Sequence, residues 1–353
     1  MYQTDISKQT ITIEGRTYSA KEIIEGIPLY DHGSPGLNKF LEDWFNDSEE
    51  ITIYTSGSTG QPKPINVKKM HMMQSASITC GFFNLKSGDK VLLCMSMNFI
   101  AGKMMVVRAI VAGLDLYPIE PSGHPLSSSE TCFQFASMVP LQIYNSLQID
   151  SEMEKLKRIG ILLIGGGAID SNLETALKDF TNKVYVSYGM TETLSHIALR
   201  RINGSEASLS YTPLPFVTIS LSKENTLVIN APMVSDKILT TNDIAEINKD
   251  GSFRIFGRKD NIINTGGIKV QAETLETILG KYIKTPFAIS SLPDKKFGEI
   301  IVLVVEQTID KLLYSKHLPT YQRPKKIIQV TKIPLTESGK INRSALKKII
   351  QSL

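Results

Sequence analysis

The stretch Tyr54-Thr-Ser-Gly-Ser-Thr-Gly-Gln-Pro-Lys63 decides the fold, and it directly follows the strand-like run Ile51-Thr-Ile-Tyr54. It places hydroxyl side chains, glycines and a lysine on one loop. Such a loop can surround phosphate oxygens with N–H, O–H and ammonium donors. It is not the P-loop of NTPases, because no Gly-Lys-Ser/Thr closes it. A polar turn without function is the alternative, and the segments further along the chain decide between the two.

Strand-like apolar runs recur through the first two thirds of the chain, each before a Gly-rich or polar turn. They are Ile51–Thr55, Lys90–Cys94, Ile161–Ile164 and Val184–Ser187. Short strands that alternate with helical segments predict an α/β fold with a wound sheet. Ligands of such sheets bind at the carboxyl ends of the strands, which is where the Gly, Ser and Thr clusters lie.

The pattern changes after about Phe253 to that of a compact α+β unit. We expect a helix over 272–282, strands at 287–291 and 300–306, and a terminal helix from Ser344. The sequence therefore predicts a large N-terminal domain over residues 1–257, a hinge at 258–260, and a small mobile C-terminal domain over 261–353.

Composition excludes several classes of protein. The chain has 353 residues, of which 42% are hydrophobic, enough for ordinary cores. Its net charge of +4 comes from scattered Lys and Arg residues, so no nucleic-acid partner is expected. The longest apolar runs are too short to cross a bilayer. The three cysteines have no disulfide or zinc spacing, and the polar N-terminus lacks a signal peptide, so we expect a cytoplasmic protein.

Five segments in order resemble the adenylate-forming superfamily of acyl-CoA synthetases, luciferases and peptide-synthetase adenylation domains. After the Tyr54–Lys63 loop come Gly165-Gly-Gly-Ala168, Tyr188-Gly-Met-Thr-Glu-Thr193, the pair Thr241-Asn-Asp243 and Gly257-Arg-Lys-Asp260 with Asn264-Thr-Gly-Gly267, and Pro334-Leu-Thr-Glu-Ser-Gly-Lys-Ile-Asn-Arg343. The resemblance implies a ligase that uses MgATP, a carboxylic acid and CoA.

The resemblance also implies a nucleotide-binding set. Its members are Thr55, Ser56, Gly57, Ser58, Thr59, Gly60, Lys63, Gly165, Gly166, Gly167, Ala168, Tyr188, Gly189, Met190, Asp243 and Arg258. Tyr188 would stack beside adenine, whereas Asp243 and Arg258 would bind the ribose hydroxyls, a task for which a carboxylate and a guanidinium are suited. A surface ion pair is the alternative for these two charges.

Three residues are implied to be catalytic: Thr191 and Lys340 at the α-phosphate, and Glu192 as a ligand of Mg2+, which prefers oxygen ligands. Thr191-Glu192 could instead be a helix N-cap, and Lys340 an inert exposed lysine. Asp260 resembles the hinge residue between the two half-reactions. Gly266 and Gly267 resemble the lining of the CoA tunnel, with an ordinary turn as the alternative.

The acid substrate is indicated by two features. The phosphate loop begins at Tyr54, whereas family members commonly have a much longer preceding segment, so we expect a truncated N-terminal subdomain. Such short forms resemble the o-succinylbenzoate–CoA ligases of bacterial menaquinone synthesis. The segment Ser96–Ala109 resembles their aryl-acid pocket, where Phe99, Lys103 and Arg108 would contact the acid. A buried carboxylate needs a cation, which Arg108 could supply.

The sequence thus predicts a two-step ligase that forms an acyl-adenylate and pyrophosphate, and then acyl-CoA and AMP. The expected substrate is o-succinylbenzoate. The alternatives are another aryl- or acyl-CoA ligase, an adenylation enzyme that loads a carrier protein, and a nucleotide-binding protein without catalysis. An outward-facing Arg108 would favour a different acid.

Overall fold

The computed structural model describes residues 4–26, 34–54, 63–310, 316–336 and 340–353. The chain divides into two compact units. The first unit comprises residues 1–168, 177–218 and 230–238, and the second comprises 169–176, 219–229 and 239–353. The predicted hinge at 258–260 lies inside the second unit, after a strand, and the predicted domain division stays a prediction.

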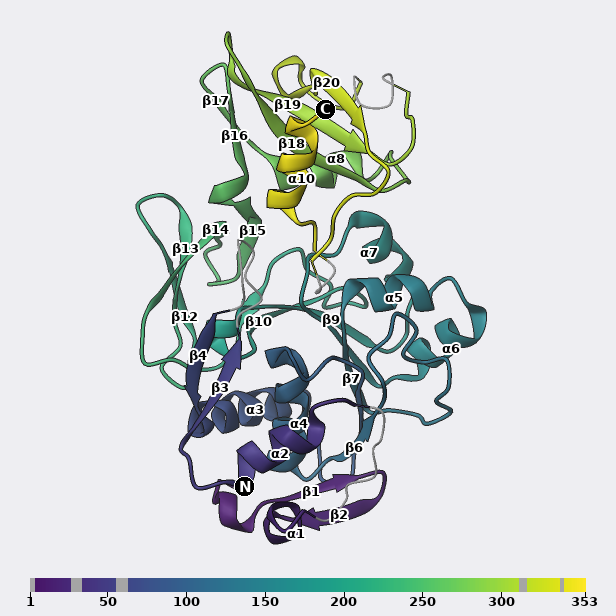
Figure 1. The fold of residues 1–353 in the computed structure, drawn as a ribbon, viewed down its shortest axis with the longest axis vertical. Helices are drawn as coiled ribbons and strands as arrows, with labels where there is room; N and C mark the ends of the chain where they lie inside the picture. The colour runs from purple at the N-terminus through teal and green to yellow at the C-terminus, as the bar shows by residue number, and fades with distance from the viewer. Residues whose placement is uncertain (1–3, 27–33, 55–62, 311–315, 337–339) are drawn as a thin grey trace. The chain divides into compact units, whose positions relative to one another are not determined.

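A nine-stranded sheet forms the centre of the first unit (Figure 1). Its order is β11-β10-β9-β8-β7-β5-β6-β1-β2. In chain order the strands are β1 (Thr10–Ile13), β2 (Arg16–Ser19), β5 (Lys90–Leu93), β6 (Asp115–Pro118), β7 (Phe135–Met138), β8 (Ile161–Ile164), β9 (Lys183–Gly189), β10 (His196–Arg201) and β11 (Thr212–Pro213). The strands from β1 to β9 in this order pair in parallel, and β2, β10 and β11 join antiparallel at the two edges. The predicted α/β class is confirmed.

Helices cover both faces of this sheet (Figure 1). The helices are α1 (Ala20–Ile24), α2 (Leu37–Phe45), α3 (Lys69–Phe83), α4 (Ile100–Ala112), α5 (Pro140–Ser146) and α6 (Asp150–Arg158), with short 3-10 turns η1 (Ile6–Lys8) and η2 (Thr191–Thr193). Burial on both faces explains why β8 reads as an unbroken apolar run, and all four of its residues are buried. Among the described residues, no helix is long and apolar enough to cross a membrane.

The strand before the phosphate loop departs from the prediction. It was expected in the wound sheet, but β3 (Glu50–Tyr54) pairs with β4 (Pro64–Lys68) in a separate two-stranded hairpin. Ile51 and Ile53 are buried while Thr52 and Tyr54 are exposed. This alternation is typical of a hairpin with one solvated face, and it differs from the continuous apolar run of a central parallel strand.

Two sheets form the second unit. The four-stranded sheet has the order β12-β13-β14-β15, and the five-stranded sheet has the order β17-β16-β19-β18 with β20 also paired to β19. The elements are α7 (Ser171–Leu177), β12 (Thr218–Leu221), β13 (Thr226–Asn230), β14 (Leu239–Ile247), β15 (Phe253–Arg258), η3 (Lys259–Asn261), β16 (Ile262–Thr265), β17 (Ile268–Gln271), α8 (Ala272–Leu279), β18 (Phe287–Asp294), β19 (Gly298–Val305), η4 (Thr320–Gln322), β20 (Lys326–Gln329) and α10 (Arg343–Gln351).

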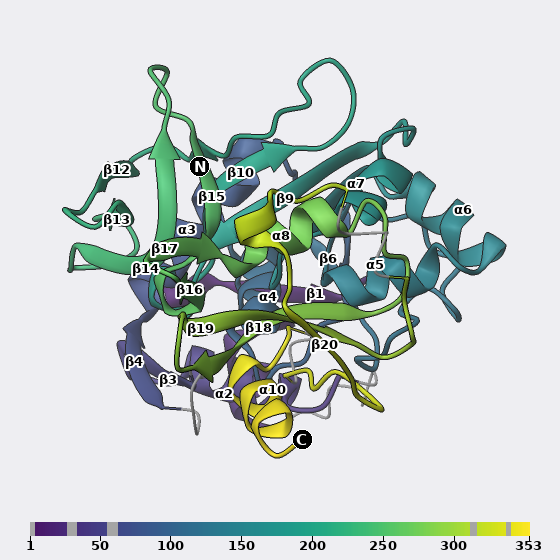
Figure 2. The same ribbon diagram turned by 90° about the horizontal axis from the view of Figure 1, so that it is seen from above.

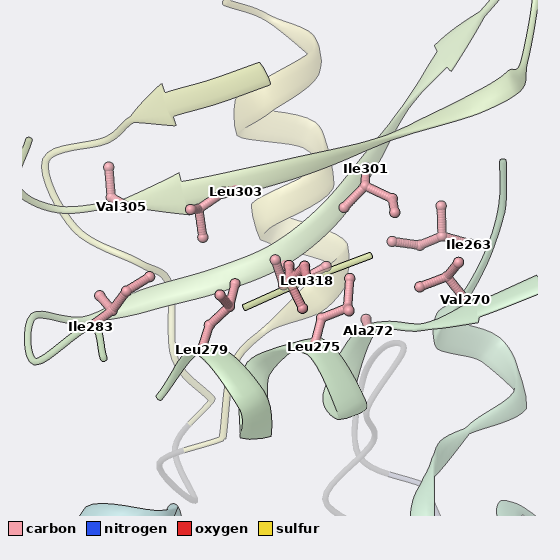
Figure 3. Close-up of a cluster of buried hydrophobic side chains, with 11 residues drawn as sticks. Ile263, Val270, Ala272, Leu275, Leu279, Ile283, Ile301, Leu303, Val305 and Leu318 are labelled. Carbon is pink, nitrogen blue, oxygen red and sulfur yellow. The ribbon is translucent and has the colours of Figure 1, made fainter. Parts of the chain in front are cut away.

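The five-stranded sheet is covered by α8 on one face and α10 on the other (Figure 2). Side chains alternate along a strand, so β19 sends Ile301, Leu303 and Val305 toward α8 (Figure 3) and Val302 and Val304 toward α10. Both sets are buried, and β19 therefore has no solvated face.

A half-buried ion pair joins the two helices to β18. Arg343 on α10 donates to both carboxylate oxygens of Glu276 on α8, at 2.9 and 2.7 Å. Both residues also contact the backbone of Ile289: Glu276 Oε1 accepts from its N–H at 2.7 Å, and Arg343 Nη1 donates to its carbonyl at 2.8 Å. Burial raises the pKa of Glu276, and the charge of Arg343 opposes that rise.

Candidate active site

The loops that follow β8 and β9 lie together at the carboxyl ends of these two strands of the large sheet. β8 and β9 are parallel neighbours with Ile164 opposite Val186, so their carboxyl ends lie together. Ser187 Oγ donates to the Ile164 carbonyl at 3.2 Å. A Cβ atom at Gly165 would lie 2.8 Å from that hydroxyl, which explains the glycine there. The structure thus brings the predicted loop 165–168 beside the predicted segment 188–192.

The segment after β9 is held closely to β10. A Cβ atom at Gly189 would lie 2.2 Å from the Ser195 carbonyl oxygen, so a larger residue would push the strands apart. Tyr188, whose side chain is half-buried, packs beside Tyr211 with 5.8 Å between ring centroids. Met190, the next residue of the predicted set, precedes η2 and is half-buried.

Thr193 holds the turn that carries Thr191 and Glu192. It is fully buried, and its hydroxyl accepts from the Met190 N–H at 3.0 Å and lies 2.8 Å from the Ser195 carbonyl. The Thr191 side chain is half-buried, whereas Glu192 is exposed. These two side chains are therefore available to a ligand, while their neighbour fixes the backbone.

Glu192 on this turn can supply only part of the coordination of a magnesium ion. Glu192 offers carboxylate oxygens, which Mg2+ prefers. Among the described residues, no group of three or more His, Cys, Asp or Glu side chains could hold a metal ion by itself. The donor set therefore suits a cation that brings most of its oxygen ligands with it, as MgATP does with its phosphates.

Asp243 and Arg258 lie opposite each other on β14 and β15. Arg258 Nη1 is 3.4 Å from Asp243 Oδ1, and Arg258 Nη2 is 2.9 Å from Asp260 Oδ2. Asn242 Nδ2 also contacts Asp260 Oδ2, at 3.1 Å. The structure thus places the predicted ribose ligands together, and the predicted hinge residue Asp260 is held by Arg258 and Asn242.

A short hairpin positions Lys340 in the second unit. Leu335 and Ile341 form a β-bridge, and the Thr336 N–H donates to the Lys340 carbonyl at 2.7 Å. Lys340 is exposed as a whole residue, but its ammonium group is partly buried. This burial lowers the pKa of Lys340. Asp243 opposes the shift, and Arg258 adds to it. Such a lysine is easier to deprotonate than a solvated one.

Gly266 and Gly267 form the turn between β16 and β17. Their φ angles are +59° and +81°, which residues with a Cβ atom rarely adopt. The Gly266 N–H donates to the Phe297 carbonyl at 2.8 Å. The turn geometry accounts for both glycines, and a role in CoA binding stays a prediction.

The predicted acid-pocket residues lie on α4 or directly before it, but they contact different neighbours. Phe99 is the half-buried residue that precedes the helix. Lys103 donates to the Met97 carbonyl and lies 5.6 Å over the Phe40 ring. Because five residues turn a helix by about 140°, Lys103 and Arg108 point in different directions.

Arg108 is buried, and no carboxylate within the described residues is its partner. It is 2% exposed, and its Nη2 donates to Ser195 Oγ at 2.6 Å. Within the part of the chain that the structure describes, its Nε has no hydrogen-bond partner and no carboxylate forms a salt bridge with it. Burial lowers the pKa of Arg108 to about 10, which still leaves it charged at neutral pH. The outward-facing alternative for Arg108 is therefore wrong.

Three residues that no sequence motif indicates, Thr79, Ser195 and His196, are linked to Arg108 by successive hydrogen bonds. The position of Ser195 and His196 directly after the Tyr188–Thr193 segment was the one available signal.

Part of the predicted nucleotide site, Thr55, Ser56, Gly57, Ser58, Thr59 and Gly60, lies outside the described residues. The ends of this loop are described. Tyr54 and Pro64 are paired in the β3–β4 hairpin, and Lys63 is exposed. The roles of the loop residues stay predictions.

Comparison with known proteins defines the class. The family described as AMP-binding enzyme matches residues 26–233, more than half of the chain. The chain therefore belongs to the AMP-binding enzyme family. A 2-succinylbenzoate–CoA ligase of Listeria monocytogenes is 26% identical over 352 residues, which cover 90% of this chain and 73% of the relative.

Two solved structures are similar to this chain. An AMP-forming acyl-CoA synthetase/AMP-acid ligase II-like protein from Dyadobacter fermentans is 32% identical with a TM-score of 0.62, covering 92% of this chain and 95% of that chain. The o-succinylbenzoate coenzyme A synthetase (MenE) from Bacillus subtilis, in complex with ATP and magnesium, is 19% identical with a TM-score of 0.71, covering 87% and 74%. The latter shows the fold. The predicted resemblance to adenylate-forming enzymes is confirmed.

Proposed function

We propose that this protein is an ATP-dependent acid–CoA ligase that acts on o-succinylbenzoate in menaquinone synthesis. In the first step the carboxylate attacks the α-phosphorus of ATP, which gives an acyl-adenylate and releases pyrophosphate. In the second step the CoA thiol attacks the acyl carbon, which gives the thioester and releases AMP. Membership of the AMP-binding enzyme family and the 2-succinylbenzoate–CoA ligase relative support both steps.

The buried charge of Arg108 carries the choice of substrate. A guanidinium removed from water costs on the order of several kcal/mol unless an anion compensates it. Within the described residues no carboxylate does so, and Nε is unpartnered. o-Succinylbenzoate has two carboxylates, and the one that does not react keeps its negative charge. That carboxylate would supply the missing partner of Arg108 and accept from its Nε–H.

The first unit contributes to binding of the nucleotide phosphates in this proposal. Thr191 and Glu192 have available side chains on a turn whose backbone Thr193 fixes. Thr191 would donate to an α-phosphate oxygen, and Glu192 would hold the magnesium ion that accompanies ATP. When bound, that ion supplies positive charge to the phosphates. Tyr188 would offer its ring to adenine.

The second unit contributes the ribose ligands and the lysine. Asp243 would accept hydrogen bonds from the ribose hydroxyls, and Arg258 already lies against it. Lys340 would place its ammonium near the reacting carboxylate and stabilise the charge that develops during adenylation. Its hairpin contacts with Thr336 hold the backbone of the lysine in place.

The test is an AMP-release assay with ATP, Mg2+ and CoA that compares o-succinylbenzoate with benzoate, a phenylpropanoid acid and octanoate. We expect a strong preference for o-succinylbenzoate. Arg108→Ala should raise its KM roughly thirtyfold or more, because an anion then loses its buried partner. The KM for octanoate should change far less. Arg158→Ala, at an exposed arginine on α6, is the control.

Other outcomes would select another activity. Preference for a monocarboxylic acid would keep the ligase chemistry and reject o-succinylbenzoate. Acid-dependent pyrophosphate release without thioester formation on free CoA would favour an enzyme that loads a carrier protein. The proposal includes a cytoplasmic location, which the three free cysteines support, because free thiols are typical of a reducing compartment.

A further inference from the structure

A series of hydrogen-bonded polar side chains, buried except for the half-buried Ser195, begins at Arg108 and ends in α3. Arg108 Nη2 is 2.6 Å from Ser195 Oγ, which is 3.2 Å from His196 Nδ1. His196 Nε2 is 3.2 Å from Thr79 Oγ1, which is 3.0 Å from the Ser75 carbonyl oxygen. We call Arg108, Ser195, His196 and Thr79 the Arg108 chain.

The direction of every hydrogen bond in the Arg108 chain follows from its two ends. A guanidinium only donates, and a carbonyl oxygen only accepts. Thr79 has one hydroxyl proton, which it donates to the Ser75 carbonyl, so it accepts from His196 Nε2–H. His196 Nδ1 then accepts the Ser195 hydroxyl proton, and Ser195 Oγ accepts from Arg108. Four protons satisfy four contacts.

The opposite arrangement leaves contacts unsatisfied. If His196 carried its proton on Nδ1, Thr79 would have to divide its one proton between His196 Nε2 and the Ser75 carbonyl. The Ser195 hydroxyl proton would have no acceptor in the chain. Unsatisfied polar groups are costly in a buried place, and Thr79 and His196 are 1% and 8% exposed.

We infer that Ser195, His196 and Thr79 are positioning residues that fix the orientation of the Arg108 guanidinium, with His196 held as the neutral tautomer protonated on Nε2. Ser195 accepts a hydrogen bond from Nη2 of Arg108, and the Nε–H group stays available to an incoming anion. The inference rests on the proposed function, because it assigns the selectivity for a second carboxylate to residues that do not touch that carboxylate.

The charges around His196 agree with a neutral ring. Burial first, and then the positive charge of Arg108, lower the pKa of His196 well below its usual range. Cys80 also lies near Arg108, and burial raises the pKa of its thiol to about 12, so it stays uncharged. A substrate carboxylate is therefore the anion that this region lacks.

Two substitutions of His196 distinguish the role of Nδ1 from that of Nε2. In His196→Asn the amide oxygen can take the place of Nδ1 and accept from Ser195. In His196→Gln the amide nitrogen can take the place of Nε2 and donate to Thr79, but the link to Ser195 is lost. We expect His196→Gln and Ser195→Ala to raise the KM for o-succinylbenzoate about tenfold or more, as loss of a bond to a charged group does.

The expected pattern has three further parts. The KM of His196→Asn for o-succinylbenzoate should stay much closer to the parent value than that of His196→Gln. In all three variants the KM for octanoate should change little, and the KM for ATP should stay at the parent value. The same histidine-to-glutamine change at His124, whose side chain is 46% exposed, is the control. Equal KM increases for o-succinylbenzoate, octanoate and ATP would mean that the variants damage the fold, and would overturn the inference.

A direct measurement uses 15N-labelled histidine in the full-length protein. Long-range 1H–15N spectra distinguish the two neutral tautomers and the imidazolium, and the signal missing in His196→Gln identifies the residue. We expect the Nε2–H form at pH 7. The Nδ1–H form or an imidazolium would overturn the inference.

The two proposals can fail separately. If Arg108→Ala raises the KM for o-succinylbenzoate but Ser195→Ala and His196→Gln do not, the positioning role is wrong and the proposed function stands. If Arg108→Ala has no effect, the carboxylate-binding role of Arg108 is wrong. The specificity part of the inference then fails with it, while the spectra still decide the tautomer.

Discussion

Asp243 and Arg258 face each other across the β14–β15 pair, with 3.4 Å between the Asp243 Oδ1 and Arg258 Nη1 atoms. Two strands of the same sheet hold both residues, so their spacing does not depend on a loop. Carboxylate oxygens only accept hydrogen bonds, so Asp243 can accept from two neighbouring hydroxyl groups.

We therefore expect Asp243→Ala to raise the KM for ATP about tenfold, because a bond between ribose and a charged group is lost. Pyrophosphate exchange at varied ATP measures this effect. Asp250→Ala, in the turn between the same two strands, should leave that KM unchanged. Similar KM values in Asp243→Ala and the parent would reject the ribose role.

Lys340 should matter for one half-reaction. We expect Lys340→Ala to lose acyl-adenylate formation by orders of magnitude, because the charge beside the reacting carboxylate is gone. The variant should still convert chemically prepared adenylate to thioester. Single-turnover assays of each step measure this, with Lys332→Ala as the control. Equal losses in both steps would mean that the lysine is structural.

The lowered pKa of Lys340 predicts the alkaline limit of adenylation. The reaction needs the charged ammonium, which is lost as pH rises through this pKa. The rate should therefore fall at a pH below that expected for a solvated lysine. In Lys340→Arg the guanidinium stays charged, so whatever activity remains should persist to higher pH. Coincident alkaline limbs in the two proteins would contradict this assignment.

Glu192 should affect the magnesium dependence. We expect Glu192→Gln to require a higher Mg2+ concentration for half-maximal adenylation, since an amide is a weaker ligand than a carboxylate. Raised Mg2+ should restore the rate in part. Glu206→Gln, at a residue whose side chain is 74% exposed, is the control. An unchanged Mg2+ dependence would leave Glu192 without this role.

The Arg343–Glu276 pair should contribute strongly to stability. Arg343→Met leaves the half-buried Glu276 without its cation, which should cost about 1.5–3 kcal/mol of the free energy of unfolding at neutral pH, as loss of hydrogen bonds to a charged group does. Its pKa, already raised, should rise further. A group with a raised folded-state pKa destabilises the fold as pH rises through that value, so the deficit should be smaller at pH 5 than at pH 8.

Denaturant unfolding at the two pH values checks this prediction. Lys347→Met on the exposed side of α10 is the control. A deficit of the same size at pH 5 and pH 8 would mean that ionisation of Glu276 is not involved.

Local sequence predicted the elements whose environment is uniform. β8 has the predicted bounds, because a strand buried on both faces is a continuous apolar run. The helix expected over 272–282 ends earlier, at Leu279, directly before Gly280. β3 was placed in the wrong sheet, since its residues specify a strand and an alternation of faces but not a partner.

The site was predictable only where a motif marks it. The motifs indicate Asp243, Arg258 and Lys340, which the structure places in one unit. The Arg108 chain could not be predicted, because Thr79 and His196 are 117 positions apart. Their contact depends on how α3 packs near β10, and no local pattern specifies that packing.

The contacts of Ile289 have a consequence for association between molecules. β18 is an edge strand, and the outward N–H and C=O groups of an edge strand can pair with a strand of another protein. At Ile289 both groups are already bound, by Glu276 and Arg343. The ion pair therefore does more than join two helices. It occupies backbone groups of an edge strand that could otherwise pair with another molecule, so its loss should promote aggregation as well as unfolding.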